Sequence, residues 1–242
     1  MENKYLHEVL PFLKNVEKKR RKQFEGYFRT APLWLLDAMV VETIPAGTIF
    51  IRENEPVETI YFVGSGKVKA TDYRISGITF DFMKPQNMLA LGGMEVLMEI
   101  DEFKTTLQAE TDCILVKLAR AKYEKWLNSD IEAFRLEAKI STASLLEEVR
   151  RNRLYLFLQG ADRLAFLYVE LYEKHNKNGV LCIKESRTSM ADETGLCLKS
   201  ISRAILKFLD EGLVKKNGNQ ILINPEQYEG LKKIIDEKID RV

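Results

Sequence analysis

The side chains with the most informative chemistry lie near the C-terminus, in the stretch TGLCLKSISRAILKFLDEGLVKK from Thr194 to Lys216. Lysine and arginine can donate hydrogen bonds to guanine O6 and N7 or to phosphates, and hydroxyl groups can bond to base edges or to the nucleic-acid backbone. The candidate residues for such contacts are Thr188, Ser189, Leu198, Lys199, Ser200, Ser202, Arg203, Lys207, Lys215 and Lys216. Taken one at a time, each lysine is better explained as ordinary surface charge.

The helix that must carry most of these residues has one apolar side. It is expected to begin near Cys197, and four of its apolar residues recur at three- and four-residue spacing, which are Ile201, Ile205, Phe208 and Leu209. The candidate residues at its start point away from this stripe or toward the N-terminal end of the helix. Packing and recognition can therefore occupy different sides of one helix.

The neighbouring segments complete a known structural plan. VLCIKES predicts a short strand, Ser186 or Thr188 can cap the helix that follows, and Gly195 permits a tight turn before the second helix. After Gly212 the pattern LVKKNGNQILIN predicts two strands joined by Asn217-Gly218, a strong hairpin signal. Two helices joined by a short glycine turn form a helix-turn-helix, in which the start of the second helix meets base edges. Together with the hairpin they predict a winged helix that binds DNA.

The first half of the chain predicts helices followed by a β-domain. Residues 5–39 have a helical pattern that Pro32 interrupts, and the basic run KKRRK is flanked by acids, which favours a solvated helix face over a nucleic-acid patch. Residues 40–118 contain short apolar runs separated by turn residues, so we expect an antiparallel sandwich or barrel. The glycines between Val63 and Val68 predict a hairpin there.

A long helix is expected to connect the two halves. Residues 121–158 contain no proline or glycine and predict a short helix and then a long one, capped near Ser129-Asp130. One face has the spacing of a coiled-coil seam, with Ala138, Thr142, Leu145, Val149, Asn152 and Leu156. Other apolar residues lie off the seam and are expected to pack against the sandwich, namely Leu136, Ile140, Ala143 and Leu146.

Two apolar faces on one helix favour a parallel homodimer, in which Asn152 would favour a two-stranded state. The alternative is a lone amphipathic helix folded onto its own domain. Gly160 follows the helix and is interpreted either as a hinge between two units or as a simple helix break.

Composition excludes several classes of protein. The 242 residues carry a formal net charge of +1, so any affinity for nucleic acid must come from a local basic surface. The three cysteines are far apart and form no CxxC or Cys/His spacing, which argues against a disulfide framework or a zinc site and suits the cytoplasm. The N-terminus does not resemble a signal peptide, and no stretch approaches the roughly 20 apolar residues of a membrane span.

An enzyme is not indicated either. The two histidines are far apart in the sequence, and there is no nucleophile elbow, no P-loop and no paired carboxylate motif of recognisable spacing. We therefore expect no catalytic residue, no metal site and no cofactor.

Three segments resemble the Crp/Fnr (catabolite-activator) family of bacterial transcription regulators: AGTIFIRENEPVETIYFVGSGKVK, RLAFLYVELYEK and, most specifically, ADETGLCLKSISRAILKFLDEGLV. The resemblance covers nearly the whole chain. It implies an α+β fold with a cyclic-nucleotide-binding-like β-roll (jelly roll), a long dimerisation helix and a C-terminal winged helix-turn-helix. The corresponding ranges are a sensor domain with N-terminal helices at 1–128, the dimerisation helix and hinge at 129–159, and the DNA-binding domain at 160–242. The resemblance also implies a homodimer, a two-fold symmetric double-stranded DNA operator and contact with RNA polymerase.

The effector segment departs from the family pattern. Cyclic-AMP-binding members hold the ribose and cyclic phosphate with a G-E-L segment and an Arg-Ser or Arg-Thr pair. Here Leu91 or Gly92 stands at the acidic position and Phe103-Lys104 at the Arg-Ser position, so the phosphate clamp is missing and Gly92-Gly93 with Lys104 would be a weak substitute. The residues that map to the effector pocket are Leu91, Gly92, Gly93, Phe103, Lys104, Thr105, Glu148 and Val149. The effector is expected not to be cyclic AMP, or to be absent.

The second helix of the winged helix departs as well. Many members read S-R-x-T-V-S-R at its start, where this chain reads CLKSISR. Leu198 cannot donate a hydrogen bond but could contact a thymine methyl group, while Lys199 or Arg203 could read guanine. Cys197 is interpreted as a small residue at the cap position in preference to a redox switch. An altered half-site is therefore expected.

Other sensors of the family are disfavoured by the same comparison. The chain lacks the N-terminal cysteine cluster of the iron–sulfur members, and His7 and His175 lie outside the roll, where haem-dependent members carry a histidine. One alternative to a regulator remains, in which the β-roll is a ligand-sensing module and the winged helix contacts proteins instead of DNA.

Overall fold

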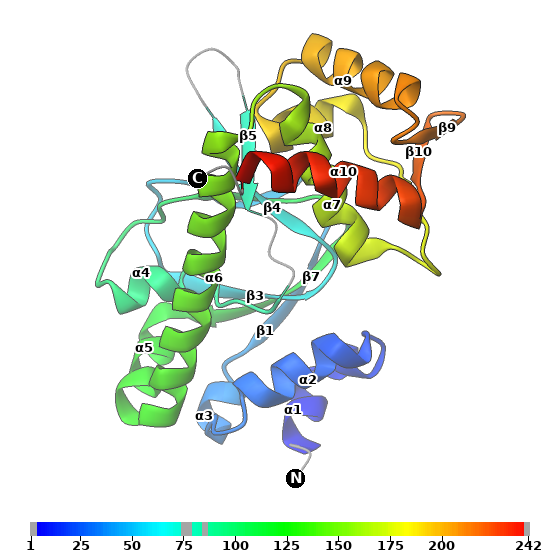
Figure 1. Cartoon of the computed structure of the whole chain (residues 1–242). Helices are drawn as coiled ribbons and strands as arrows, with labels where there is room; N and C mark the ends of the chain where they lie inside the picture. The colour runs from blue at the N-terminus through cyan, green and yellow to red at the C-terminus, as the bar shows by residue number, and fades with distance from the viewer. Residues whose placement is uncertain (1–3, 74–78, 84–86, 240–242) are drawn as a thin grey trace. The chain divides into compact units, whose positions relative to one another are not determined.

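The computed structural model of the chain describes residues 4–73, 79–83 and 87–239 (Figure 1). The chain divides into two compact units, residues 1–146 and residues 147–242. The boundary falls inside the longest helix, α6 (Ile131–Phe157). Each unit has its own cluster of buried apolar side chains, so each is described by itself.

The N-terminal unit contains helices, then strands, then helices again. Its elements are α1 (Lys4–Val9), η1 (Pro11–Lys14), α2 (Lys18–Tyr27), α3 (Leu33–Leu36), β1 (Val40–Ile44), β2 (Ile49–Ile51), β3 (Thr59–Ser65), β4 (Val68–Tyr73), β5 (Thr79–Met83), α4 (Gly93–Leu97), β6 (Thr106–Ala109), β7 (Cys113–Ala119), α5 (Arg120–Ser129) and the first part of α6. The predicted interruption at Pro32 is confirmed, because Pro32 stands immediately before α3.

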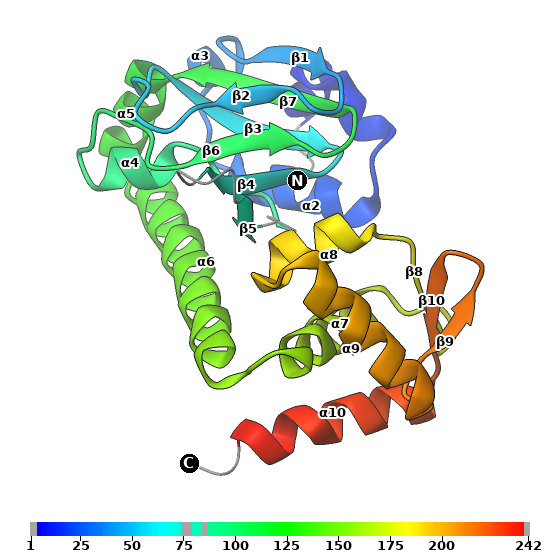
Figure 2. The same cartoon turned by 90° about the horizontal axis from the view of Figure 1, so that it is seen from above.

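The strands of this unit form two antiparallel sheets that together make a roll (Figure 2). One sheet has the order β1-β7-β3 and the other has the order β2-β6-β4-β5. In β3 the side chains of Ile60 and Phe62 are buried while those of Thr59 and Tyr61 are partly exposed, which is the alternation of a half-buried strand. The predicted antiparallel sandwich or barrel is therefore confirmed.

The predicted hairpin between Val63 and Val68 is wrong. β3 pairs with β7, whereas β4 pairs with β5 and β6, so residues 66–67 connect one sheet to the other. Gly64 at the end of β3 and Gly66 in the connection serve close packing. A Cβ on Gly64 would lie 2.5 Å from Cε2 of Phe12, and a Cβ on Gly66 would lie 2.5 Å from the carbonyl oxygen of Asp112.

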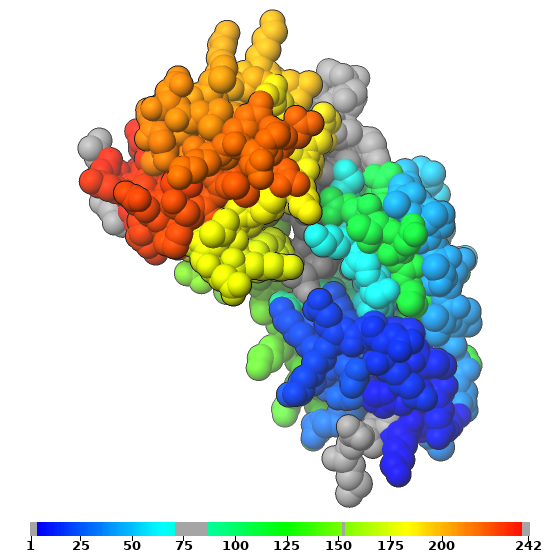
Figure 3. Space-filling model, turned by 90° about the vertical axis from the view of Figure 1, so that its right-hand side faces the viewer, coloured from blue at the N-terminus to red at the C-terminus, as the bar shows by residue number. Residues whose placement is uncertain are grey.

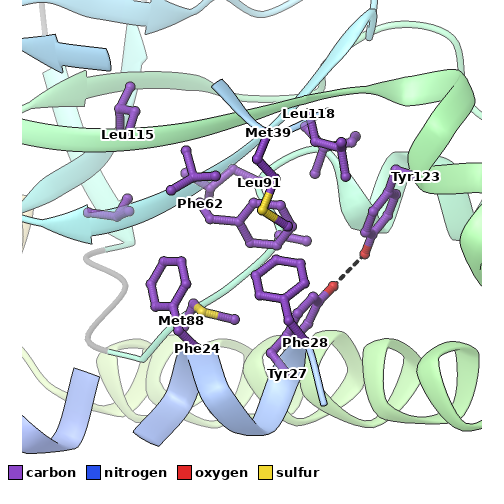
Figure 4. Packing of buried hydrophobic residues seen from close by; sticks show 14 of the residues in the cluster. Phe24, Tyr27, Phe28, Met39, Phe62, Met88, Leu91, Leu115, Leu118 and Tyr123 are labelled. Carbon is purple, nitrogen blue, oxygen red and sulfur yellow. Dashed lines mark hydrogen bonds between the residues drawn. The ribbon is translucent and has the colours of Figure 1, made fainter. Parts of the chain in front are cut away.

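The core of the N-terminal unit is rich in aromatic side chains (Figure 4). Phe28, directly after α2, stacks on Trp126 of α5 with ring centroids 5.8 Å apart, and Phe62 of β3 meets Tyr27 edge to face at 5.4 Å. Aromatic pairs at such distances add stability beyond the area that they bury. The N-terminal helices and the end of the roll thus share one core.

The helix pair at the end of this unit matches its prediction closely. Asp130 separates α5 from α6, and its carboxylate accepts hydrogen bonds from the backbone N–H of Glu132 at 3.0 Å and of Ala133 at 3.2 Å. These bonds satisfy donors that the first turn of a helix leaves free. Leu136 and Ile140 pack against the core, as expected.

Further along α6 the apolar side chains lose contact with the protein. Ala143 and Leu146 are exposed, so the expectation that they pack against the sandwich is wrong. On the predicted seam, Leu145 and Val149 are exposed and Leu156 is 77% exposed. Thr142 is exposed and Ala138 is half-buried, while the side chain of Asn152 lies outside the described part of the structure. The seam is therefore an uncovered apolar face.

The C-terminal unit combines a three-stranded sheet with helices. Its elements after α6 are α7 (Ala161–His175), β8 (Leu181–Ile183), α8 (Arg187–Thr194), α9 (Leu198–Asp210), β9 (Lys215–Asn217), β10 (Gln220–Ile223) and α10 (Pro225–Ile239). The sheet order is β8-β10-β9, with β10 antiparallel to both neighbours. The sequence patterns predicted β8, α8, α9 and the β9–β10 hairpin, but they did not predict the pairing of β8 with β10, and no signal was interpreted as α10.

The fold class is confirmed as α+β, with a β-roll, a long helix and a C-terminal winged helix. Gly160 precedes α7 with a φ of +51°. Among the residues that the structure describes, no helix combines the length and apolarity needed to cross a lipid bilayer.

Candidate nucleic-acid interface

The first helix of the predicted DNA-binding motif, α8, is fixed by a side-chain cap. Ser186 is the capping residue, and its hydroxyl oxygen accepts a hydrogen bond from the backbone N–H of Ser189 at 3.1 Å. The cap leaves the side chain of Thr188 exposed and that of Ser189 half-buried. Of the two capping residues considered from the sequence, Ser186 performs the role.

The turn between α8 and α9 requires glycine. Gly195 has a φ of +68°, a left-handed conformation that glycine adopts without steric cost. Just before it, the hydroxyl of Thr194 donates to the carbonyl oxygen of Met190 at 2.7 Å, and Nη1 of Arg163 donates to the carbonyl oxygen of Thr194 at 3.4 Å. The turn is thereby tied to both α8 and the start of α7.

One side of α9 packs against the core of the C-terminal unit. Ile201, Ile205 and Phe208 are buried, as the spacing predicted, Leu209 is partly buried, and Ala204 is buried beside them. The ring of Phe208 lies 6.1 Å from that of Tyr168 in α7. This stripe fixes the rotation of α9 about its axis and therefore decides which side chains face outward.

The outward side of α9 carries the predicted recognition residues together. Leu198 is 51% exposed, Lys199 and Arg203 are exposed, and Ser200 and Ser202 are half-buried. In Figure 3 the orange segment that includes α9 lies at the surface, with side chains projecting into solvent. The structure thus groups these residues at the N-terminal end of one helix.

Arg187 belongs to this group, although the sequence reasoning missed it. It is the first residue of α8, and its Nη1 donates to Oγ of Ser202 at 3.2 Å, which joins the starts of the two helices. Its guanidinium group is exposed and has further donors. A basic residue directly after the predicted capping serine was the signal that could have found it.

Two further predicted contacts differ in their surroundings. Lys207 lies near the C-terminal end of α9, and its Nζ is 3.8 Å from a carboxylate oxygen of Glu211. Lys215 and Lys216 lie on β9 and are exposed, opposite Leu222 and Ile221 of β10. The two wing lysines are therefore better placed for a polyanion than Lys207, whose charge is partly compensated.

Cys197 caps α9 from an exposed position. Its Sγ lies 3.3 Å from Oγ of Ser200, and this hydrogen bond is the main reason that the pKa of the thiol lies below its ordinary value. The cap position agrees with the interpretation of Cys197 as a small capping residue. The thiol forms no disulfide.

The segment at the expected effector position is closed by apolar packing. Leu91 is buried and exchanges backbone hydrogen bonds with Tyr61 of β3 at 2.9 and 3.0 Å. Gly92 has a φ of +99°, and a Cβ at this position would lie 2.9 Å from Cδ1 of Ile60 and 3.2 Å from Cε1 of Phe103. The aromatic ring of Phe103 is itself buried, so it fills space at a position where relatives present a polar pair.

Lys104 does not replace the missing clamp in this arrangement. Its Nζ faces Glu102 at 3.5 Å, and its backbone N–H donates to Oε1 of Glu95 at 3.3 Å. Thr105 is half-buried. Gly93 lies against a carboxylate oxygen of Glu137, so a buried acidic group adjoins this segment. Glu148 and Val149 belong to the other unit, and their part in an effector pocket stays a prediction.

Within the described residues, no group of three or more metal-ligating side chains comes together. The prediction that the chain uses no cofactor stays a prediction.

Comparisons with known proteins support the assignment of both units. Residues 41–130 match the family model of the cyclic nucleotide-binding domain. Among solved structures, FixK2 from Bradyrhizobium japonicum is 20% identical, with a TM-score of 0.63, and the match covers 80% of this chain and 96% of that one. The global regulator CLP from Xanthomonas campestris, described as responsive to c-di-GMP, is 18% identical with a TM-score of 0.68, covering 86% and 99% of the two chains.

A transcriptional regulator of the Crp/Fnr family from Thermus thermophilus gives a similar result, with 20% identity, a TM-score of 0.65 and coverage of 82% of this chain and 100% of that one. No curated protein sequence matches the chain. The resemblance to Crp/Fnr regulators is thus confirmed in the fold, since these matches cover 80–86% of the chain.

Proposed function

We propose that this chain is a sequence-specific DNA-binding transcription regulator of the Crp/Fnr type, acting as a homodimer on a two-fold symmetric operator. The observation that carries the proposal is the division of α9 into a buried apolar stripe and an exposed basic and hydroxyl-bearing N-terminal end. That end of a helix-turn-helix is the part that enters the major groove. The fold shared with Crp/Fnr regulators supports the same function.

Base contacts are assigned to the first two turns of α9. Lys199 and Arg203 are suited to guanine O6 and N7, and Leu198 to the methyl group of thymine. Arg187 holds Ser202 and adds a second guanidinium group at the same edge. Phosphate contacts are assigned to Lys215 and Lys216 on the wing, because phosphates attract exposed lysines without regard to sequence. Thr188, Ser189, Ser200 and Lys207 complete the proposed surface.

Dimerisation is assigned to α6. Leu145, Val149 and Leu156 expose apolar side chains along one face at coiled-coil spacing, and burial of such side chains against a second copy removes apolar area from water. A parallel pair would place the two α9 helices about one DNA turn, roughly 34 Å, apart. Gly160 is the proposed hinge between the dimer helix and the DNA-binding domain, with domain limits at 128/129 and 159/160. RNA polymerase is the proposed partner of the bound dimer.

The effector is proposed not to be cyclic AMP, or to be absent. A cyclic phosphate needs a bidentate arginine or a nest of free N–H groups, and at this position the chain presents Phe103 and a lysine paired with Glu102. The roll would then serve as a scaffold or bind a ligand of other chemistry.

Selection of operators from a random double-stranded library, followed by gel shifts over a range of salt concentrations, tests the proposal. We expect a palindromic site and an affinity that falls steeply with salt. Arg203→Ala should weaken binding and relax the preference at one base pair. Lys233→Ala, which removes an equally exposed lysine from α10, is the matched control and should bind like the parent protein.

The alternative function predicts a different result in the same experiment. If the winged helix contacts proteins instead of DNA, no enriched sequence emerges at low salt, and Arg203→Ala and Lys233→Ala behave alike. That outcome would overturn the regulator proposal.

A further inference from the structure

A carboxyl group is buried in the N-terminal unit without a cation. Glu137 of α6 has no exposed surface. Tyr27 of α2 donates a hydrogen bond to its Oε2, and Ser141, one turn further along α6, donates to its Oε1 at 2.8 Å. The hydroxyl oxygen of Tyr123 in α5 lies 2.6 Å from that of Tyr27, a contact marked by the dashed line in Figure 4. A chain of hydroxyl groups therefore ends on this carboxyl group.

The carboxyl group also lies directly on the effector segment. A Cβ added to Gly93, the first residue of α4, would lie 2.5 Å from Oε1 of Glu137 and 3.2 Å from its Cδ. Only glycine leaves room for this contact. One side chain thus meets four elements, which are α2, α4, α5 and its own helix α6.

Among the described residues, the groups shown to contact Glu137 supply hydroxyls and backbone but no positive charge. They are Tyr27 from α2, Tyr123 from α5, Ser141 from α6 and Gly93 from α4. The nearby ion pair of Arg29 with Glu132 lies at the surface, with both side chains more than half exposed. An ionised carboxylate in such a dry site has lost hydration that no cation replaces.

The titration of the cluster follows from this geometry. Burial raises the pKa of Glu137 above its ordinary value of 4.5, and the hydrogen bonds from Tyr27, Ser141 and Tyr123 offset part of that rise. Burial is also the main cause that raises the pKa of Tyr27 and of Tyr123 well above 10.0, so both phenols stay protonated as donors. Glu137 is then the member of the cluster that ionises at a lower pH than the two phenols.

We propose that Glu137 is a proton-linked latch, whose neutral carboxylic acid holds the N-terminal helices and the Gly92-Gly93 segment onto α6, and whose ionisation loosens that contact. The proposal goes beyond DNA binding and does not depend on it. Because α6 also carries the exposed apolar face, the latch connects the state of the roll to the helix that leaves it.

The sign of the pH dependence is fixed by the direction of the shift. A carboxyl group with a higher pKa in the folded than in the unfolded chain binds more protons when folded. The contribution of Glu137 to stability is therefore fully present below its ordinary pKa of 4.5, falls as pH rises from there through the folded pKa, and then changes no further.

The fluorescence of Trp126 gives a readout inside the cluster. The sequence has two tryptophans, and the Trp126 ring lies 6.0 Å from that of Tyr27 and 6.1 Å from that of Tyr123. Trp34→Phe removes the other one, a surface side chain above Lys125. In this background we expect the Trp126 emission to follow a sigmoidal transition with pH, and Tm to fall by about 3 °C per pH unit across it.

Glu137→Gln tests the assignment, because glutamine keeps the size and shape of the neutral acid but cannot ionise. We expect it to abolish the transition, while Glu132→Gln, at an exposed glutamate on the same helix, leaves the transition in place. The infrared carbonyl stretch of a neutral carboxylic acid should disappear in Glu137→Gln only.

A third variant keeps the test decisive if Glu137→Gln does not fold. Tyr27→Phe removes a hydrogen bond that lowers the pKa of Glu137, so the transition should move to higher pH. A transition that is unchanged in both Glu137→Gln and Tyr27→Phe, or a wild-type protein without the neutral acid band, would overturn the proposal.

Discussion

The Gly92 segment of the roll and the start of α9 are two places where this chain departs from Crp/Fnr patterns. The side chains that differ are buried in the first and exposed in the second. Around Gly92 the packing closes inward, with Leu91 and Phe103 buried and the Glu137 carboxyl group against Gly93. At the start of α9, Leu198, Lys199 and Arg203 face solvent. Substitution at a buried segment changes what the interior can hold, whereas substitution at an exposed helix end changes what the protein can touch. The fold therefore accommodates the substitutions at Gly92 by close packing and those at the start of α9 by exposure to solvent.

The largest effect should come from the buried side of α9. Phe208→Ala removes a fully packed ring and should lower the free energy of unfolding by about 3–5 kcal/mol. Leu206→Ala, two residues earlier and 60% exposed, should stay within about 0.5 kcal/mol. Urea denaturation of both variants measures the difference, and equal losses would show that α9 is not fixed by its stripe.

Gly92→Ala should show that the roll segment is closed by packing. The left-handed backbone and the contact with Ile60 at 2.9 Å predict a loss of about 1–3 kcal/mol. Gly26→Ala is the matched control, because a Cβ there meets nothing within 4 Å and the residue lies in helix α2, so a gain of about 0.4–1 kcal/mol is expected. If Gly92→Ala left the free energy of unfolding unchanged, the segment would have room for a ligand.

The exposed end of α9 should respond in affinity and not in stability. Arg203→Ala is expected to cost about 1–3 kcal/mol in binding to the selected operator and to relax the preference at one base pair. Lys215→Ala should weaken binding to all sequences alike and reduce the salt slope by about 1. Gel shifts on operator and scrambled DNA separate the two patterns; identical behaviour of both variants would place Arg203 on a phosphate.

The smallest effect is expected from cyclic AMP. A ligand at a hundredfold its Kd raises the free energy of unfolding by about 2.7 kcal/mol, and we expect no shift in Tm with cyclic AMP because Phe103 and Lys104 offer no clamp. Thermal unfolding with and without the nucleotide makes the measurement. A clear upward shift would contradict the inward closure of the roll segment.

The accuracy of the sequence reasoning followed the range of the interactions involved. Gly195, Asn217-Gly218 and the stripe of α9 are local signals, and the winged helix matches them. The hairpin expected between Val63 and Val68 failed because strand pairing depends on β7 and β6, far along the chain.

The role of Glu137 had no local signal at all. In the sequence it is one charge among many on a helix, and its burial depends on Tyr27, Tyr123 and Gly93, which lie 14 to 110 residues away. Arg187 was missed for a related reason, since its bond to Ser202 spans the turn between two helices. The recognition contacts assigned to α9, the dimer and the effector pocket stay predictions.

The exposed apolar face of α6 links dimerisation to the concentration of the protein. Leu145, Val149 and Leu156 are exposed in the single chain. Their burial against a second copy would obey mass action. The fraction of assembled chains would then rise with the amount synthesised, and occupancy of a two-fold site would respond more steeply than in proportion to gene dosage. The activity of a promoter that contains such a site, measured at several expression levels, would report how strongly two α6 helices associate.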